Sequence, residues 1–220
     1  MKPVQHEEQS IKFASGMIAA FALVISGLFL QPAQANTITG NLWLVPEATT
    51  QNAIPANVPG TTPYVVFDVN SPFNFNATGA TIGTWLASGA AFNIVENTPG
   101  TLASLMDNSV MGALLNFTGF VTVTNGQTFT VTHDDGLTLI IGALNLGFNP
   151  GPTAPVTSLA TYTGPSGTFP FQLVYGECCG GPAVLQLDLP LSNTPAPEPA
   201  TIGLLSIGLA GLARRLRRRV

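Results

Sequence analysis

The sequence predicts an all-β protein built as an antiparallel β-sandwich or barrel. Apolar residues occupy every second position through most of 117–141, which is the spacing of strands with one buried face. Similar short segments follow one another along the chain, separated by Gly- and Pro-rich turns, and no long amphipathic helix interrupts residues 36–194. Apolar segments near the two ends predict an N-terminal signal helix and a C-terminal transmembrane sorting helix.

Several short elements are expected before the central segment. Ile38, Leu42 and Leu44 fall on even positions and indicate a first strand. In order, we expect a strand over 37–45, a loop over 46–63, a strand over 64–69, alternation at Phe73 and Phe75, a loop or short strand over 79–89, a strand over 90–95 and one short helix within 101–115.

The central segment, 117–141, predicts three successive antiparallel strands. Asn125-Gly126 lies between the first two and favours a type I′ hairpin, in which both central residues have positive φ. Residues 133–136, with the sequence His-Asp-Asp-Gly, form the second predicted turn. Beyond it we expect a long loop over 142–157, a strand over 169–175 and a last strand over 184–189.

Asp134 and Asp135 give the strongest chemical signal in the chain. Two neighbouring carboxylates at an exposed strand end repel each other, so they require a cation, a nest of hydrogen-bond donors or bulk water. A Ca²⁺ ion takes about six to eight oxygens, and Asn145, Asn149 and carbonyls of the following loop are the nearest candidates to complete a site. The alternative is a plain Asx-type turn before Gly136.

Charge narrows the choice of ligand. None of the seven Lys and Arg residues lies within 36–194, whereas eight Asp and Glu residues do, giving this region a formal charge of −8. Such a surface cannot neutralise phosphates, so nucleic acid is excluded as a partner. A divalent cation or a neutral polar ligand such as a glycan fits it.

The ends of the chain resemble export signals. Residues 1–35 combine two lysines, an apolar run over 13–30 and Ala33-Gln34-Ala35, as in a cleavable signal peptide; the alternative is a retained membrane helix. Residues 195–220 combine a Pro-rich linker, an apolar stretch over 200–213 and an Arg cluster, as in a membrane anchor whose basic end stays in the cytoplasm. The alternative is a free basic tail. The domain itself is then expected over 36–194.

The tail resembles the PEP-CTERM sorting signal of Gram-negative bacteria. The residues that carry the resemblance are Pro197, Glu198 and Pro199, followed by the apolar helix and then by Arg214, Arg215, Arg217, Arg218 and Arg219. The resemblance implies processing by an exosortase, at least transient membrane anchoring, and a secreted or cell-surface location. It also implies an association with exopolysaccharide and biofilm.

Residues 117–189 resemble the later part of a PA14 domain, a β-sandwich of toxins, glycosidases and adhesins. The matching features are Thr118-Gly119, the Asn-Gly turn, the Asp-Asp-Gly turn at 134–136 and the strand end Tyr175-Gly176-Glu177. In the lectin members, the equivalent aspartates are joined by a cis peptide and bind calcium, which grips sugar hydroxyls. The resemblance therefore implies a calcium-dependent glycan site at Asp134 and Asp135.

Other residues leave alternatives open. Trp43, Trp85, Tyr162 and Tyr175 suit stacking on sugars, but aromatic residues of this kind belong more often to the core. Cys178 and Cys179 are candidates for a local disulfide, with free thiols or an intermolecular bond as alternatives.

No motif of an enzyme is present in 36–194, which contains a single histidine and no phosphate loop or nucleophile motif. Adjacent aspartates are also poorly placed for glycoside hydrolysis, which needs two carboxylates across a cleft. We therefore expect a non-enzymatic surface protein that binds extracellular polysaccharide, with calcium as the candidate ion. The alternative is a structural matrix or coat protein without a discrete ligand site.

Overall fold

The computed structural model describes residues 36–97 and 106–194. The expected signal peptide at 1–35 and the expected sorting tail at 195–220 lie outside the described residues. Within the described part, none of the helices is long and apolar enough to cross a membrane.

The described elements are mostly short strands, as predicted. In chain order they are β1 (Thr37–Leu44), α2 (Glu47–Thr50), η1 (Pro55–Asn57), β2 (Val65–Asn70), β3 (Phe73–Thr78), α3 (Ile82–Ser88), β4 (Phe92–Glu96), β5 (Ala113–Val123), β6 (Thr128–His133), β7 (Gly136–Ile141), β8 (Leu144–Asn145), β9 (Val156–Thr161), β10 (Gly167–Gly176), β11 (Pro182–Leu187) and β12 (Leu191–Ser192).

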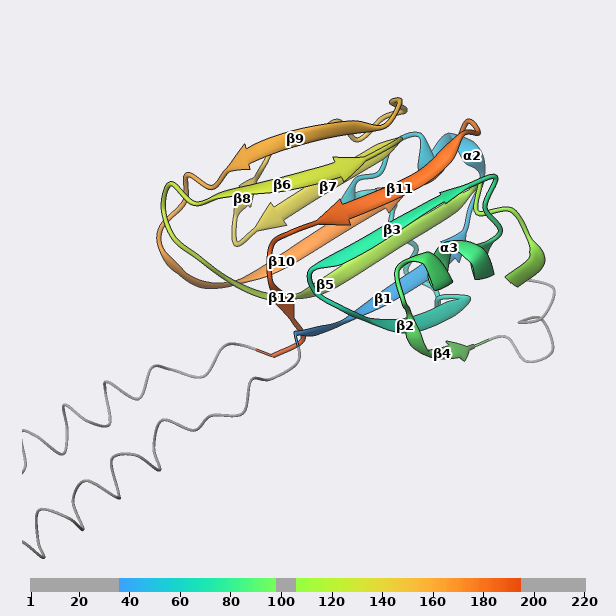
Figure 1. Ribbon diagram of the computed structural model, residues 1–220, viewed down its shortest axis with the longest axis horizontal. Coiled ribbons are helices and arrows are strands. Elements are labelled where there is room, and N and C mark those ends of the chain that lie inside the picture. Colours follow the sequence, from blue (N-terminus) through green and yellow to red (C-terminus); the bar gives the residue numbers. More distant parts are fainter. Residues whose placement is uncertain (1–35, 98–105, 195–220) are drawn as a thin grey trace, which may run out of the picture. The chain divides into compact units, whose positions relative to one another are not determined.

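Two antiparallel sheets face each other and enclose the core (Figure 1). The larger, eight-stranded sheet has the order β4-β2-β1-β5-β10-β7-β8, and β12 pairs with the free side of β5. The smaller, four-stranded sheet has the order β3-β11-β6-β9. The predicted all-β antiparallel fold is confirmed, and it takes the sandwich form.

The central segment differs from its predicted pairing. β5 and β7 belong to the larger sheet, whereas β6 lies between them in sequence and belongs to the smaller one. The two links are therefore arches between sheets, and the prediction of two hairpins is wrong. At the first link only Gly126 has positive φ, 81°, and the Gln127 amide closes the turn onto the Thr124 carbonyl at 3.0 Å. The buried odd-numbered face is confirmed, because hairpins and arches both leave these side chains inside the sandwich.

One local prediction made from the first half of the chain is wrong, that of a loop or short strand over 79–89. Residues 79–89 contain the helix α3, which starts with a capping box between Thr81 and Thr84. Its buried residues Ile82, Trp85 and Leu86 have the spacing of one helix face. The short helix expected within 101–115 agrees with the structure in its described part, where residues 106 and 107 are helical before β5 begins at Ala113; residues 101–105 lie outside the described part.

The predicted loop at 142–157 is more regular than expected, since it contains β8 and ends in the first residues of β9. The sequence does not predict β9, because most side chains of this strand are exposed; Leu159, for example, is 73% exposed. Its polar sequence lacks the alternation that marks a half-buried strand.

The aromatic residues considered for sugar stacking are all core residues. Trp43, Trp85, Tyr162 and Tyr175 are buried, with exposed fractions of 6% or less. The Trp85 ring stacks on Phe75 at a centroid distance of 4.1 Å and lies parallel to the Tyr175 ring at 6.0 Å. This stack fixes Tyr175, whose hydroxyl reaches the acidic residues described next.

Candidate metal centre

Asp134 and Asp135 form the link that carries the chain from β6 in the smaller sheet to β7 in the larger one. Their exposed fractions are 3% and 4%, so the expectation of carboxylates at an exposed strand end is wrong. Asp134 continues the pairing of β6 with β11: its amide donates to the Val184 carbonyl at 3.1 Å, and the Val184 amide donates to Asp134 Oδ1 at 2.7 Å. Its side chain therefore points inward.

Asp135 makes the turn itself, with φ of 45°. Aspartate tolerates this left-handed conformation better than most residues. Its amide donates to the Thr153 carbonyl at 2.9 Å, and its Oδ2 accepts the Cys178 amide at 2.7 Å. The peptide joining the two aspartates is trans, because the described part has its cis bond at Ser71-Pro72, so the cis link implied by the PA14 resemblance is not found.

Glu177 is a third acid at this position, which the sequence does not identify as a ligand. It follows β10, whose Gly176 pairs with Gly136 at the start of β7, so the strand register brings it beside the aspartates. One carboxylate oxygen from each of Asp134, Asp135 and Glu177 lies within 4.8 Å of the others. We call these three residues the acidic cluster. Only the pairing of β7 with β10 could have revealed the third member.

The Tyr175 hydroxyl joins two members of the cluster. It donates to Asp134 Oδ1 at 2.7 Å and also makes a short contact with Glu177 Oε2. A phenol has a single hydrogen, so it cannot satisfy two ionised carboxylates at once. Without a cation, the arrangement is satisfied when Glu177 is itself protonated and donates to the tyrosine oxygen.

The electrostatics agree with this protonation. The pKa of Glu177 is raised from 4.5 to about 8, chiefly by burial and in part by the charges of both aspartates, while the hydrogen bond from Tyr175 opposes the shift. Burial also raises the pKa of Asp134 and of Asp135, although hydrogen bonds to each carboxylate oppose the shift. No Lys or Arg occurs in 36–194 to compensate these charges.

His133 stabilises the link between β6 and β7 by a hydrogen bond to the backbone, and its ring does not act as a base for the cluster. Its Nδ1 lies 3.0 Å from the Asp135 carbonyl oxygen, which only accepts, so Nδ1 carries the hydrogen in this bond. Burial lowers the pKa of His133. Its ring also packs edge-on against Phe148 at 5.9 Å, which ties the loop after β8 to the link.

The donor set of the cluster suits a hard cation. All the available atoms are carboxylate oxygens, and ligands about 2.3–2.6 Å from a shared Ca²⁺ ion lie within about 5 Å of one another. The 4.8 Å limit on the cluster's spacing is compatible with that geometry. Asp134 Oδ2, Asp135 Oδ1 and Glu177 Oε1 accept no hydrogen bond from a described residue, so one oxygen of each side chain is available to a ligand.

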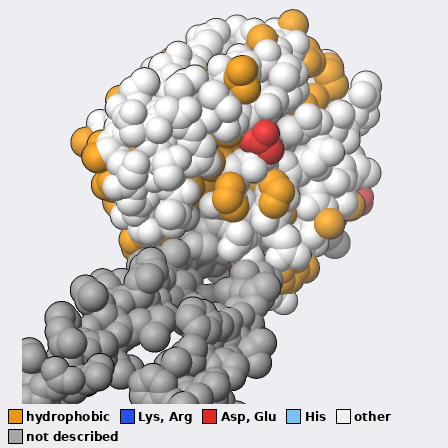
Figure 2. All heavy atoms as spheres, turned by 60° about the vertical axis from the view of Figure 1, so that its left-hand side comes forward, with side chains coloured by type: hydrophobic (Ala, Val, Ile, Leu, Met, Phe, Trp, Pro, Cys, Tyr) orange, Lys and Arg blue, Asp and Glu red, His pale blue; other side chains and the backbone are white. Residues whose placement is uncertain are grey.

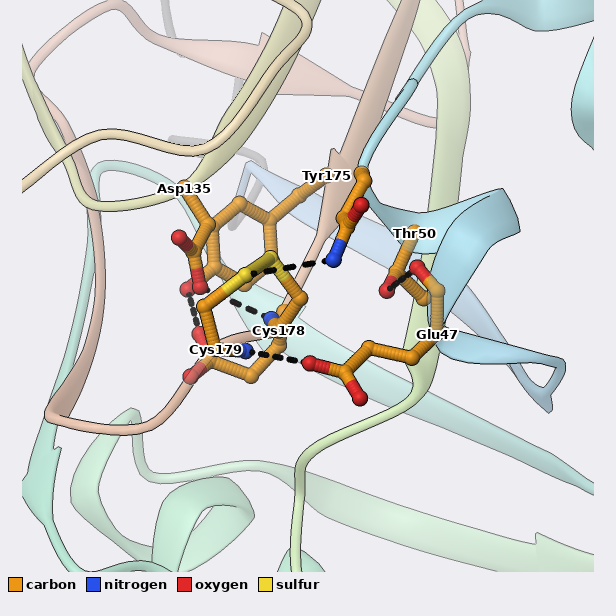
Figure 3. The surroundings of a disulfide bond; sticks show 8 residues. Glu47, Thr50, Asp135, Tyr175, Cys178 and Cys179 are labelled. Carbon is orange, nitrogen blue, oxygen red and sulfur yellow. Dashed lines mark hydrogen bonds between the residues drawn. A yellow bond between two sulfur atoms is a disulfide. The ribbon is translucent and has the colours of Figure 1, made fainter.

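The neighbouring sulfurs do not add to this donor set. Cys178 and Cys179 form a disulfide with each other, so neither offers a thiolate. Figure 3 shows Asp135 and Glu47 approaching this disulfide turn from opposite sides. The Cys178 amide donates to Asp135, and the Cys179 amide donates to Glu47 Oε1 at 3.1 Å. The disulfide turn thus supplies backbone donors that hold two acids in place.

Asn145 and Asn149, the two asparagines predicted to complete the calcium site, lie at different distances from the cluster. Asn145 is in β8 opposite Ile140, at the far end of β7 from the aspartates, and its Oδ1 accepts the Gly147 amide at 2.9 Å. The structure does not bring it to the cluster. Asn149 lies nearer, since its carbonyl accepts the Leu137 amide at 2.8 Å. Its side chain is exposed and accepts the Gly151 amide at 3.0 Å.

Gly136 and Gly176 pair with each other next to the cluster, and each allows a loop carbonyl to approach closely. A Cβ at Gly136 would collide with the Pro150 carbonyl, and one at Gly176 would collide with the Thr50 carbonyl. These positions therefore require glycine for close backbone approach.

We expect Gly136→Ala to lower the free energy of unfolding by about 1–3 kcal/mol, because the added methyl group must displace the loop at Pro150. Urea unfolding measures the change. Gly60→Ala is the control, since nothing lies within 4 Å of its added methyl group. Equal stability of the two variants would contradict the proposed close packing.

Comparisons with known proteins agree with both resemblances. Residues 195–219 match the family model described as the PEP-CTERM protein-sorting motif. No curated protein matches the chain in sequence.

Two solved structures share the fold. A PA14 sugar-binding domain from an RTX adhesin has a TM-score of 0.53 and 15% identity, covering 70% of this chain and 88% of that one. The PA14 domain of the MpAFP antifreeze protein has a TM-score of 0.50 and 19% identity, covering 68% and 79%. The fold neighbours are therefore PA14 domains, and the sorting motif implies export and routing by an exosortase.

Proposed function

We propose that the exported β-sandwich, over 36–194, is a non-enzymatic module that binds extracellular polysaccharide and holds Ca²⁺ at Asp134, Asp135 and Glu177. The observation that carries the proposal is the burial of three carboxyl groups within 4.8 Å in a region without any Lys or Arg. Buried like charges are costly unless a cation or protons neutralise them. Calcium suits the all-oxygen donor set.

Each residue around the cluster has a separate part in this proposal. The three carboxylates supply charge and ligand oxygens, and Tyr175 orients Asp134 through its hydroxyl. The Cys178 amide orients Asp135. Carbonyls of the surrounding loops or water complete the ligand set, and Asn149 is the nearer of the two asparagines first considered. When bound, Ca²⁺ would neutralise the cluster and offer coordination to sugar hydroxyls.

Access from solvent is compatible with such a role. Trp85 Nε1 is the buried side-chain polar atom left without a partner in the described part of the chain. The partnerless oxygens of the acidic cluster therefore keep some contact with solvent. This supports a coordination position that a ligand hydroxyl can reach.

The choice of a polysaccharide rests on two observations. A base-free acidic surface disfavours anionic ligands and leaves neutral glycans. One of the fold neighbours is a sugar-binding PA14 domain, which makes a carbohydrate ligand the leading choice for this fold. The sorting motif supports a place of action at the cell surface or in a biofilm matrix, with transient membrane anchoring through 200–213.

A glycan array probed with full-length protein tests the proposal. We expect binding that is strongest in Ca²⁺, weaker in EDTA, and insensitive to Ca²⁺ in the Asp134→Asn variant. Asp107→Asn, which changes an exposed acid outside the cluster, is the control. If wild-type protein binds no glycan with or without Ca²⁺, the matrix or coat protein without a discrete ligand site becomes the better account.

A further inference from the structure

The outer face of the smaller sheet has a cavity that is separate from the acidic cluster. Its volume is about 310 Å³, and the residues that matter below are Pro72, Asn74, Thr130, Thr132, Gln186 and Asp188. They come from β3, β6 and β11 and from the residues flanking those strands. The cavity lies at the lower end of the usual range for ligand pockets, about 300–1,000 Å³.

The strand register explains why these side chains meet. Gln186 pairs with Asn74 on one side and with Thr132 on the other, so the three form one row across adjacent strands. Their neighbours in sequence, such as Phe73 and Leu187, are buried in the core. Alternate residues of a strand point to opposite faces, so the polar row faces outward.

Several groups in the cavity have no hydrogen-bond partner. The amides of Asn74 and Gln186 and the hydroxyl of Thr130 bond to no other described residue. Asp188 Oδ1 accepts the Thr130 amide at 2.7 Å, which leaves Oδ2 available. By contrast, the Thr132 hydroxyl is already bonded to Thr157 at 2.9 Å. The cavity therefore presents two amides, one hydroxyl and one carboxylate oxygen to a ligand.

These groups select a hydroxyl-rich, uncharged ligand. Amide side chains both donate and accept, as sugar hydroxyls do, and the free carboxylate oxygen accepts. No basic residue is available in 36–194 to bind a sulfate, uronate or phosphate group. The face drawn in Figure 2 likewise shows no Lys or Arg side chain among the described residues and few acidic ones. The exposed ring of Pro72 adds an apolar surface for sugar C–H groups.

We propose that this cavity is a second carbohydrate subsite, which binds a neutral glycan through Asn74, Gln186, Thr130 and Asp188 without a cation. It deepens the polysaccharide-binding function proposed above and rests on it for the class of ligand. Its position is distinct from the acidic cluster: Asp188 lies four residues along the chain from Val184, or about 13 Å of extended strand. The cluster also faces between the sheets, whereas the cavity faces outward.

Titration calorimetry with full-length protein tests the subsite. The probes are dextran, laminarin and cello-oligosaccharides as neutral glycans, with alginate as the anionic comparison, all in EDTA. We expect at least one neutral glycan to bind, alginate to be excluded, and the double variant Asn74→Ala, Gln186→Ala to bind about tenfold more weakly because two hydrogen-bonding groups are lost. Asn76→Ala is the matched control, since Asn76 is an exposed asparagine on the same strand that does not line the cavity.

The outcomes separate this subsite from the calcium site. Asp107→Asn, an exposed position outside both sites, is expected to leave neutral-glycan binding in EDTA unchanged. Binding that appears only with Ca²⁺ and vanishes in Asp134→Asn would support the calcium site and overturn the second subsite. The second subsite is also overturned if no neutral glycan binds in EDTA, or if the double variant and the Asn76→Ala control bind alike.

Discussion

Ca²⁺ added to the metal-free protein at pH 8 is expected to raise its melting temperature by about 5–10 °C at about a hundred times the dissociation constant. The reason is the burial of Asp134, Asp135 and Glu177 without a basic partner. A cation that binds only the folded state removes their repulsion and adds its own binding free energy to folding. Thermal melting followed by circular dichroism, in EDTA and in a Ca²⁺ series, measures the shift.

Variants of the cluster make this expectation specific. Glu177→Gln removes one ligand charge and is expected to abolish most of the Ca²⁺ response. It should also stabilise the metal-free protein at pH 8 by roughly a few kcal/mol, because a neutral amide replaces a carboxyl group that is costly to ionise in a buried site. Glu177→Gln is therefore expected to weaken the stabilisation by Ca²⁺ while it stabilises the metal-free protein. Asp107→Asn, at an exposed position, should change neither quantity. A destabilised metal-free Glu177→Gln protein, or an equal Ca²⁺ response in all variants, would refute the account.

Stability in EDTA is expected to fall as the pH rises from about 4.5 to about 8. The pKa of Glu177 is raised on folding from 4.5 to about 8, so its contribution is fully present below the lower value and is lost as the pH passes the higher one. A shift of that size corresponds to roughly 5 kcal/mol as an upper limit. Asp134 and Asp135 have raised pKa values and act in the same direction.

His133 acts in the opposite direction at lower pH. Burial lowers its pKa from 6.5, so folding becomes less favourable as the pH falls and the unfolded imidazole binds a proton. The loss of stability with rising pH should therefore be clearest above about pH 7.5, where His133 is mostly neutral in the unfolded chain as well as in the folded one. Urea unfolding between pH 5 and 9 in EDTA measures this profile. Saturating Ca²⁺ should remove this decline in stability. Glu177→Gln should remove the part of the decline that Glu177 causes. A rise in stability toward pH 8 in EDTA would be inconsistent with the raised pKa values.

The sequence predicts the buried faces of the sandwich better than its pairing. Phe117, Val131 and Leu139 are all fully buried, as their odd-numbered positions indicate. Periodicity within a strand reports which side chains are inside and contains no information about which sheet the strand joins. For that reason the sequence predicts hairpins on either side of β6, where the structure has arches.

The candidate site was predicted in part. Adjacent aspartates before a glycine identified the link at Asp134 and Asp135, but their burial depends on packing that local sequence does not contain. Glu177 is forty-two residues from Asp135 along the chain and joins it only because Gly176 of β10 pairs with Gly136 of β7. Asn145 is close to the aspartates in sequence, but the extended course of β7 places it at the opposite end of that strand.

Calcium titration calorimetry of the full-length protein at pH 8 tests the central claim most directly. The account predicts a saturable site of about one ion per chain in the wild type, proton release on binding that varies with pH between about 6 and 8, and loss of that site in both Asp134→Asn and Glu177→Gln. If the wild type shows no saturable calcium site, or if both variants retain it unchanged, Asp134, Asp135 and Glu177 do not form a metal centre.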